Sequence, residues 1–303
     1  MFIIKYRKIF YALSGILIAM SVGSLFVWGL NFGIDFKGGA IVEVSYLEGR
    51  PEISAIKENL DKLSLGSYSL QPAGSDGFIL RSRAINDAER PLIQESFSFK
   101  GAEKIEVKRF NSIGPVLGKE AAIKSIISIL IVIFCIVIFI AFAFRKVSEP
   151  VSSWKYGFVA IIALLHDVLV PTGVFAVLGH YYGYEVDTLF VTALLVVLGF
   201  SIHDTIVVFD RVRENLNLSR GNRDKKPFDN IVGESISQTF TRSINTSLTT
   251  VLALVALYIF GAESTRHFSL ALIVGITAGT YSSIFLGSPL LVTFEKWQNR
   301  KKQ

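Results

Sequence analysis

Residues 125–144 read SIISILIVIFCIVIFIAFAF and contain no Asp, Glu, Lys or Arg. An α-helix rises about 1.5 Å per residue, so a helix of roughly 20 apolar residues crosses a hydrocarbon core about 30 Å thick. Five further stretches share this length and character. The sequence therefore predicts an α-helical polytopic membrane protein with six transmembrane helices. They are expected at residues 9–30, about 123–144, 156–178, 188–209, 243–262 and 268–294.

The composition of the 303 residues supports this class. Hydrophobic residues make up 51% of the chain and charged residues 18%, with a mean hydropathy of +0.48. These values exclude an ordinary soluble enzyme and a disordered chain. The first span could be a cleaved signal peptide, but its length exceeds the usual apolar core of such a peptide, which favours an uncleaved anchor. The pattern GxxxxGK[ST] of a phosphate-binding loop does not occur in the sequence.

Basic residues in the short loops predict the orientation. Lys and Arg resist translocation, and 17 of them lie at the two termini and in the loops on the same side, against one on the other side. Both termini of this multi-pass protein are therefore expected in the cytoplasm. Residues 31–124 lie on the far side and carry 13 basic and 13 acidic residues. The pI of 9.3 thus reflects topology and does not predict nucleic-acid binding.

The far-side segment has the pattern of a small α+β domain. Apolar alternation, turn residues and prolines predict the order βαββαβ, which is the ferredoxin-like unit. Pro91 favours a late start or a break in the second helix. We expect the domains 1–30 (N-terminus and first span), 31–120 (extracytoplasmic domain) and 121–303 (remaining spans). The expected elements are the strands 40–46, 67–71, 77–82 and 103–110, and the helices 51–63 and 86–97.

Two carboxylates interrupt the apolar spans. Asp167 lies twelve residues beyond Lys155, about 18 Å into the membrane, and Asp204 lies six residues before Asp210, about 9 Å deep. A charged side chain in a spanning helix costs about 2.5–3.5 kcal/mol on insertion scales. Such residues therefore face a partner or a water-lined cavity, which makes both carboxylates candidate functional groups.

The expected fifth span offers a polar face to Asp204. Arg242, Asn245, Thr246 and Thr249 recur at i, i+3, i+4 and i+7, so they share one side of a helix. An Arg suits a carboxylate at this depth because it donates two parallel hydrogen bonds and stays charged. Alternatively, Arg242 only marks the cytoplasmic end of the helix. The residues alone leave both interpretations open.

Histidines accompany both carboxylates. His166 and His203 each precede an Asp, but adjacent helical residues point about 100° apart, which disfavours a shared site. The single cysteine, Cys135, lies in another span, and neither a metal site nor a cofactor is expected. In the last span Gly275, Gly279, Ser283 and Gly287 form a small-residue stripe, which predicts close packing against a helix of this chain or of a partner.

Five motifs in order resemble one family. GIDFKGG at residues 33–39 and GFSIHDTIVVFDRVREN at residues 199–215 are similar to motifs of the SecF proteins, in the SecD/SecF family of the bacterial Sec export machinery and the resistance-nodulation-division superfamily. GPVLGKE (114–120), LHDV (165–168) and QTFTRS (238–243) support the resemblance, which covers nearly the whole chain. The sequence departs from the family at His203, usually Asn, at Phe200, often Tyr, and in extra residues around 222–226. Within these motifs, Gly33, Asp35, Gly38 and Gly39 are expected to form a turn, and Asp210 and Arg211 to mark the cytoplasmic boundary, which are structural roles.

The resemblance implies a function. Members of this superfamily use an ion gradient rather than ATP, so the chain is expected to use the proton or sodium motive force to promote late stages of protein export, without being an enzyme. Asp204 and Arg242 occupy the positions implicated in ion coupling, with Asp167, His203 and Thr246 as further candidates. Expected partners are SecD as the complementary six-span half, the SecYEG channel, the SecA-dependent preprotein, YajC and the lipid bilayer.

Two alternatives belong to other classes. A passive scaffold could stabilise the translocon, but it would not require buried acids. An intramembrane aspartyl protease could use Asp167 and Asp204, although such enzymes favour a GxGD sequence and Arg242 would be an unusual neighbour for two carboxylates that share a proton. A free-standing small-molecule exporter is generally built from two such halves.

Overall fold

The computed structural model describes residues 2–143, 153–221 and 226–300. The chain forms two compact units, one of residues 1–31 and 127–303 and the other of residues 32–126. Within the described residues, six helical segments are long and apolar enough to cross a membrane, as the sequence predicts. They are Arg7–Trp28, Pro115–Ala143, Lys155–Tyr182, Thr188–Ser219, Phe228–Phe260 and Thr265–Gln298.

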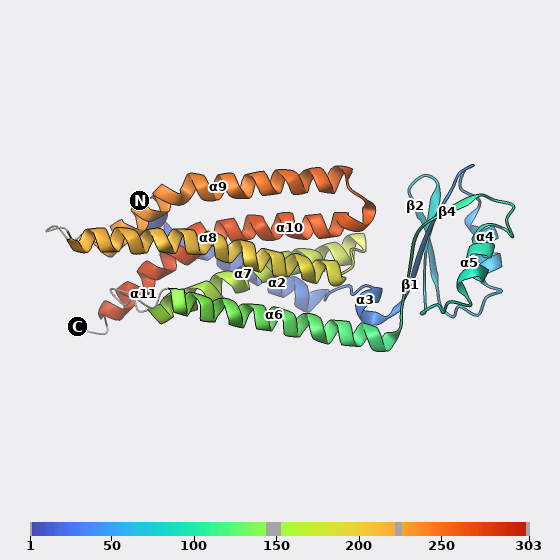
Figure 1. Cartoon of the computed structure of the whole chain (residues 1–303), viewed down its shortest axis with the longest axis horizontal. Coiled ribbons are helices and arrows are strands. Elements are labelled where there is room, and N and C mark those ends of the chain that lie inside the picture. Colours follow the sequence, from blue (N-terminus) through green and yellow to red (C-terminus); the bar gives the residue numbers. More distant parts are fainter. Residues whose placement is uncertain (1, 144–152, 222–225, 301–303) are drawn as a thin grey trace. The chain divides into compact units, whose positions relative to one another are not determined.

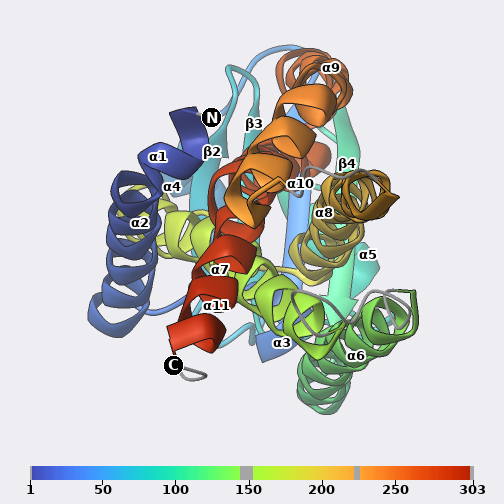
Figure 2. The same ribbon diagram turned by 90° about the vertical axis from the view of Figure 1, so that its left-hand side faces the viewer.

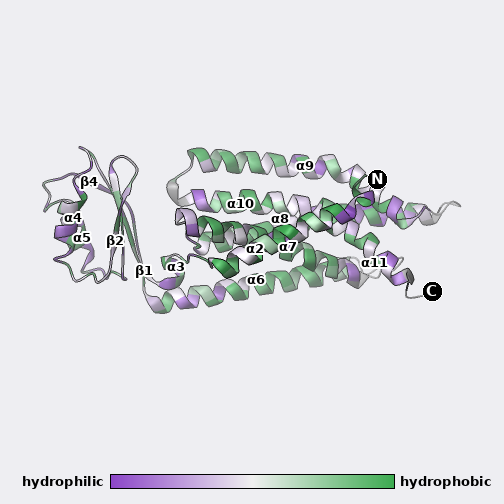
Figure 3. Ribbon diagram, turned by 180° about the vertical axis from the view of Figure 1, so that it is seen from behind, coloured by the Kyte–Doolittle hydropathy of each residue, from purple (hydrophilic) through white to green (hydrophobic). Residues whose placement is uncertain are grey.

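The first unit is a helical bundle with an inner and an outer group of spans (Figures 1 and 2). The inner spans are α7, α8 and the last span, whose most apolar windows are 50%, 50% and 67% buried. The outer spans are α2, α6 and α9, at 17%, 6% and 11%. Figure 3 shows hydrophobic residues along the bundle and hydrophilic residues towards its ends. The bounds are α1 (Phe2–Lys5), α2 (Arg7–Val27), α6 (Pro115–Ala143), α7 (Ser153–Tyr182), α8 (Thr188–Gly221) and α9 (Phe228–Phe260).

Several helices extend beyond the apolar stretches that predict them. α9 begins 15 residues before the expected start at Ser243, and α8 continues well past Asp210. The added turns are polar or amphipathic. A hydropathy pattern therefore locates the apolar, membrane-spanning part of a helix but does not locate the first and last residues of that helix. Arg145, Lys146, Arg223, Lys225, Lys301 and Lys302, all part of the charge count, lie outside the described residues, as do residues 222–225 of the extra segment.

The last span is interrupted near its middle. α10 (Glu263–Tyr281) leads into a π-helical turn, η1 (Ser282–Gly287), and then into α11 (Ser288–Arg300). The backbone N–H of Ser288 donates to the Ser283 carbonyl, five residues back, and the Ser288 hydroxyl donates to the same oxygen at 2.8 Å. Pro289 follows and has no N–H to continue the α-helical pattern. The sequence analysis did not predict this turn.

The second unit contains a four-stranded antiparallel sheet. Its elements follow the expected order of strands and helices, and the strand order in the sheet is β2-β3-β1-β4. The short helix α3 (Ile34–Lys37) precedes it. The bounds are β1 (Gly39–Tyr46), α4 (Ile53–Leu60), β2 (Ser69–Ala73), β3 (Gly77–Ser82), α5 (Arg90–Phe97) and β4 (Ile105–Ile113).

One apolar core joins this sheet to its two helices. Ile56 of α4 and Ile93 and Phe97 of α5 are fully buried with Val42 of β1 and Leu80 of β3. In α4 and α5 the buried core residues are four positions apart, and in β1 and β3 they are two positions apart, so each element gives one face to the core. The unit therefore has a core of its own.

Several bounds in this unit differ from the expectation, and three of the differences involve a proline or a shorter helix. The strand predicted to end at Gln71 continues to Ala73, because Pro72 lies in β2 at the edge of the sheet, where a missing N–H is tolerated. α4 covers only the middle of the range 51–63. α5 starts late, at Arg90, with Pro91 in its first turn, as Pro91 predicts.

Candidate functional site

Asp167 lies at the centre of a buried hydrogen-bond network. Its carboxyl group is fully buried on α7. Oδ2 accepts hydrogen bonds from the hydroxyls of Ser201 on α8 and of Ser282 in η1, the latter at 2.8 Å, and Oδ1 lies 2.8 Å from His166 Nδ1. This one side chain thus connects three inner segments, and both of its oxygens have hydrogen-bond partners.

Hydroxyl groups extend this network along η1 and α8. Thr205 and Ser283 are buried and hydrogen-bonded to each other at 2.8 Å, and the Ser283 hydroxyl donates to the Ser201 carbonyl at 3.3 Å. Thr280 donates to Ser247 of α9 at 2.5 Å. The inner spans are therefore joined by a seam of short polar side chains, which the sequence analysis missed because hydroxyls barely change the hydropathy of a span.

Small residues bring α8 and the last span close enough for these bonds. A Cβ on Gly275 would lie 2.3 Å from Val197 Cγ2, and a Cβ on Gly279 would lie 3.1 Å from Ser201 Cβ. The predicted small-residue stripe thus packs within this chain, against α8.

Asp204 lies one turn from Ser201 on α8 and has a different environment. The residue is 3% exposed, and its Oδ2 is buried without a hydrogen-bond partner. The facing side chain on α9 is Ser243, whose buried hydroxyl also lacks a partner. A buried polar atom without a partner is costly, and such atoms concentrate at functional sites. Asp204 is the buried carboxylate of the bundle whose hydrogen bonding is incomplete.

The predicted polar face of α9 makes no described hydrogen bond or ion pair to Asp204, although Arg242 lies within electrostatic range of its carboxyl group. Arg242, Asn245, Thr246 and Thr249 are all exposed, and no ion pair joins Arg242 to Asp204 among the described residues. The buried face of α9 instead carries Thr239, Ser243 and Ser247. The periodicity correctly grouped the four residues on one side, but hydropathy could not say which side of a mixed helix packs inward.

The remaining candidates lie at the surface of the bundle. His203 is exposed, in contrast to its neighbour Asp204. The side chain of Asp210 is 65% exposed and lies 3.5 Å from Arg213. Arg211 donates to Gln238 of α9 at 2.6 Å, and Asn215 donates to the same side chain at 2.9 Å. The motifs at residues 199–215 and 238–243 therefore contact each other.

The glycine motif at residues 33–39 also contacts a second motif. Gly38 and Gly39 have φ values of +76° and +131°, which other residues rarely adopt. A Cβ on Gly38 would lie 2.7 Å from the Cα of Pro115, and one on Gly118 would lie 2.9 Å from the Gly38 nitrogen. Gly33 and Asp35 begin the single-turn helix α3. This segment is thus a tight turn whose backbone packs on the start of α6.

No group of three or more His, Cys, Asp or Glu side chains that could hold a metal ion occurs in the described part of the chain. His166 Nε2 is buried without a partner. The site consists instead of one satisfied carboxyl group, Asp167, one incompletely satisfied carboxyl group, Asp204, and the hydroxyl seam. Such a set can bind or release a proton or a small cation and can connect that event to helix packing.

The comparisons with known proteins agree with this arrangement. The family described as "Protein export membrane protein SecD/SecF, C-terminal" matches residues 93–297, and the SecD/SecF GG motif matches residues 23–46. The chain therefore belongs to the SecD/SecF family of protein export membrane proteins.

Individual relatives have a more specific name. A protein translocase subunit SecF from Thermobaculum terrenum is 41% identical, with 98% of this chain and 94% of the relative covered, and a SecF from Anaerolinea thermophila is 37% identical, with 97% and 94% covered. The crystal structure of SecDF, a translocon-associated membrane protein from Thermus thermophilus, matches with a TM-score of 0.78 and 30% identity. That match covers 98% of this chain and 38% of the SecDF chain. A second SecDF structure, in a super-membrane-facing form, matches with a TM-score of 0.65 and 31% identity. The chain is thus a multi-pass membrane protein of the Sec pathway, of the kind that serves as a translocase subunit.

Proposed function

We propose that this chain is the SecF-type subunit of an accessory complex of the Sec translocase, and that it uses the proton or sodium motive force to promote late stages of protein export across the bacterial cytoplasmic membrane. The names of its relatives support the translocase role. Charge counting supports cytoplasmic termini. The strand order β2-β3-β1-β4 with two helices supports a ferredoxin-like extracytoplasmic domain.

The observation that carries the proposed energy coupling is the environment of Asp204. Its carboxyl group is buried in a spanning helix with one oxygen unpartnered, whereas Asp167 has donors for both of its oxygens. A group with incomplete bonding can change its protonation or bind a cation without breaking an existing network. One charge that crosses 100 mV yields about 2.3 kcal/mol, which biases a two-state equilibrium more than tenfold.

The exposed polar face of α9 supports a partner half. Arg242 and Asn245 would be costly in contact with lipid, so the face requires a cover of protein or water. The SecDF chain that this structure resembles is much longer than this one, and SecD is the proposed cover. That cover would also place Arg242, which lies within electrostatic range of Asp204, in a protein environment. SecYEG, SecA-dependent preproteins and YajC are the further proposed partners.

A protease would need Asp167 and Asp204 to share a proton. The described bonds of Asp167 are made to His166, Ser201 and Ser282, and none of them is made to Asp204. The geometry therefore favours two separate carboxyl groups. The remaining alternative is a passive scaffold, and the experiment must distinguish it from a subunit that uses an ion gradient.

The test is the rate at which secreted proteins mature in the source bacterium after its own copy of this chain is depleted. Wild type, Asp204→Asn and the exposed control Asp210→Asn are supplied in turn, and maturation is followed by pulse labelling, with assembly checked by co-purification of SecD. We expect Asp204→Asn to assemble and to export at least tenfold more slowly, with Asp210→Asn near wild type. Export at the wild-type rate by Asp204→Asn would make the scaffold the better account.

A further inference from the structure

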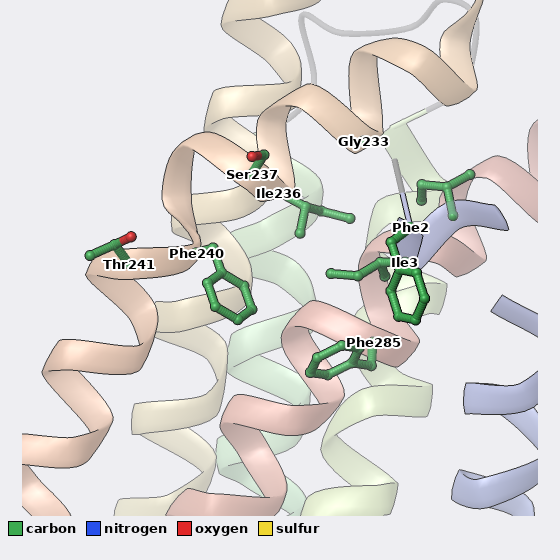
Figure 4. Close-up of a pocket in the computed structure, with 9 residues that line it drawn as sticks. Phe2, Ile3, Gly233, Ile236, Ser237, Phe240, Thr241 and Phe285 are labelled. Atoms are coloured by element: carbon green, nitrogen blue, oxygen red, sulfur yellow. The ribbon is translucent and has the colours of Figure 1, made fainter. Parts of the chain in front are cut away.

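At the end of the bundle that holds α1 and α11, the structure has a cavity of about 550 Å³ with largely apolar walls. α1 contributes Phe2 and Ile3, α9 contributes Ile236 and Phe240, and η1 contributes Phe285. Figure 4 shows Ile236 and Ile3 pointing toward one another across the cavity, near the rings of Phe240 and Phe285. This volume lies within the range of small-molecule sites, which run from about 300 to 1,000 Å³.

A second cavity of about 470 Å³ adjoins the first, and its lining is basic. Phe2 and Ile4 line both cavities, so the two share a wall. The second is also lined by four cations and one carboxylate: Lys5, Arg7, Lys8, Lys296 and Asp229. Lys296 pairs with Asp229 at 2.9 Å, so three cations remain in excess.

The two cavities together have the chemistry of an amphiphile with an anionic head. We propose that they bind one anionic phospholipid, with an acyl chain in the apolar cavity and the phosphate headgroup among the cations of the basic cavity. The proposal goes beyond the export function and holds whether or not Asp204 couples an ion gradient.

Access from the bilayer favours a lipid over a soluble ligand. The span α9, which lines the apolar cavity, and the span α2, which lines the basic cavity, are outer helices whose apolar windows are only 11% and 17% buried. Phe2 itself is 66% exposed and lies at the boundary between the cavities. Tyr6 and Trp297 are exposed at the same end, where amphipathic aromatic rings mark the headgroup level of a membrane. A headgroup at this level reaches the cations while its chain enters between α1 and α9, as in basic sites between helices that bind anionic lipids.

Native mass spectrometry of the full-length, delipidated protein tests the proposal. Phosphatidylglycerol and phosphatidylcholine of identical chains are titrated in parallel, because they differ in headgroup charge. Lys5→Gln with Lys296→Gln removes two cations of the basic cavity and keeps Arg7 and Lys8, which help to orient the first span. Arg213→Gln with Lys226→Gln removes two exposed cations at the same end of the bundle and outside both cavities, and serves as the matched control.

We expect wild type to bind phosphatidylglycerol at least tenfold more tightly than phosphatidylcholine. The cavity variant should lose most of that preference, and the matched control should keep it. Ser237→Trp, at the exposed rim of the apolar cavity, should weaken phosphatidylglycerol binding about tenfold with every cation retained; Thr241→Trp at the same rim is the second variant if the first does not fold.

Four results would overturn the proposal. Equal binding of the two lipids would mean a non-specific lipid shell. Equal losses in the cavity variant and the matched control, or undiminished binding in a folded cavity-filling variant, would mean adsorption to surface charge. Complete competition by millimolar inorganic phosphate would mean an anion site without a lipid chain.

Discussion

Asp167 on α7 and Asp204 on α8 are two buried carboxyl groups with different surroundings, although Ser201, which bonds to Asp167, lies only one helical turn from Asp204. Asp167 has three described neighbours that bond to it, from α7, α8 and η1. Asp204 has an oxygen without a partner and faces Ser243, which also lacks one. The same residue type thus has hydrogen-bond partners for both oxygens at one position and incomplete hydrogen bonding at the other.

Asp167→Ala should destabilise the bundle. The change would leave the hydroxyls of Ser201 and Ser282 and the imidazole of His166 without their acceptor, which costs about 1–3 kcal/mol for each group that finds no other partner. We expect the melting temperature in detergent to fall by several degrees, measured by the loss of monodisperse protein on heating. Asp210→Ala, whose side chain is 65% exposed, is the control and should melt as wild type. Equal melting of the two variants would contradict the structural role.

A pH effect is expected outside the membrane. Arg83 and Asn86 hold the pKa of Glu89 at about 2, since Arg83 donates to both carboxylate oxygens and the Asn86 backbone donates to one of them. The ordinary pKa is about 4.3, so any stability from this contact is present above that pH and is lost as the pH falls towards 2. Because both side chains are solvent-exposed, the effect on stability is small.

Arg83→Gln should raise the pKa of Glu89 towards its ordinary value, because the largest cause of the lowering is removed. The measurement is a pH titration of labelled Glu carboxyl carbons by NMR in the full chain. Arg50→Gln, which removes an exposed cation that contacts Gly74, is the control and should leave the pKa at about 2. An unchanged value in Arg83→Gln would mean that the Asn86 backbone alone is responsible.

For single residues, the sequence predicts the candidate functional groups better than it predicts the side chains that form hydrogen bonds with them. An Asp in an apolar run is conspicuous, so Asp167 and Asp204 could be found without a structure. Ser201 and Ser282 could not, because a serine in a span carries little hydropathy signal and a hydroxyl commonly bonds back to its own helix. The exposure of Arg242 was also hidden, because the inward side of α9 depends on the neighbouring helices.

For the helices and strands, the features that depend on local sequence could be predicted, and the features that depend on packing against other elements could not. Six spans and the alternation of strands and helices could be predicted, because length and periodicity are local properties. The start of α9 at Phe228 and the π-helical turn could not. The first is set by amphipathic turns outside the apolar window, and the second depends on the bonds that Ser283 and Ser288 make within a packed bundle.

Gly275→Val should disrupt the packing of the last span on α8. The added Cβ would lie 2.3 Å from Val197 Cγ2, which is far too close, and the stiff valine side chain cannot move away without a backbone shift. We expect a lower yield of folded protein and a lower melting temperature. Gly15→Val on α2 is the matched control, since nothing lies within 4 Å of its added Cβ. A control variant that is equally damaged would point to helix propensity instead of packing.

For the whole molecule, the exposed polar face of α9 predicts where the partner half binds. Thr249→Cys, in a chain whose native cysteine is replaced by Cys135→Ala, should cross-link to cysteines placed on the spans of SecD in assembled complexes. Met20→Cys on the outer face of α2 is the control, because that face is apolar and lipid can cover it. Cross-linking of Met20→Cys alone would place the partner on another side of the bundle.

In the whole molecule, the chain passes between the two units twice, at residues 31–32 and 126–127, near two of the family motifs. Within the second unit these motifs contact each other, because Gly38 packs on Pro115. Under the proposed function, a protonation or cation-binding event at Asp204 drives protein export.

The most direct test of that account measures export against the size of the gradient. The chain is reconstituted with SecD and a Sec channel in vesicles, and the export rate is measured over a series of imposed proton or sodium gradients for wild type, Asp204→Asn and Asp210→Asn. The account predicts that the rate rises with one of the two gradients in wild type and in Asp210→Asn, and that it is independent of both in an assembled Asp204→Asn complex. The same rise with the gradient in Asp204→Asn would contradict it.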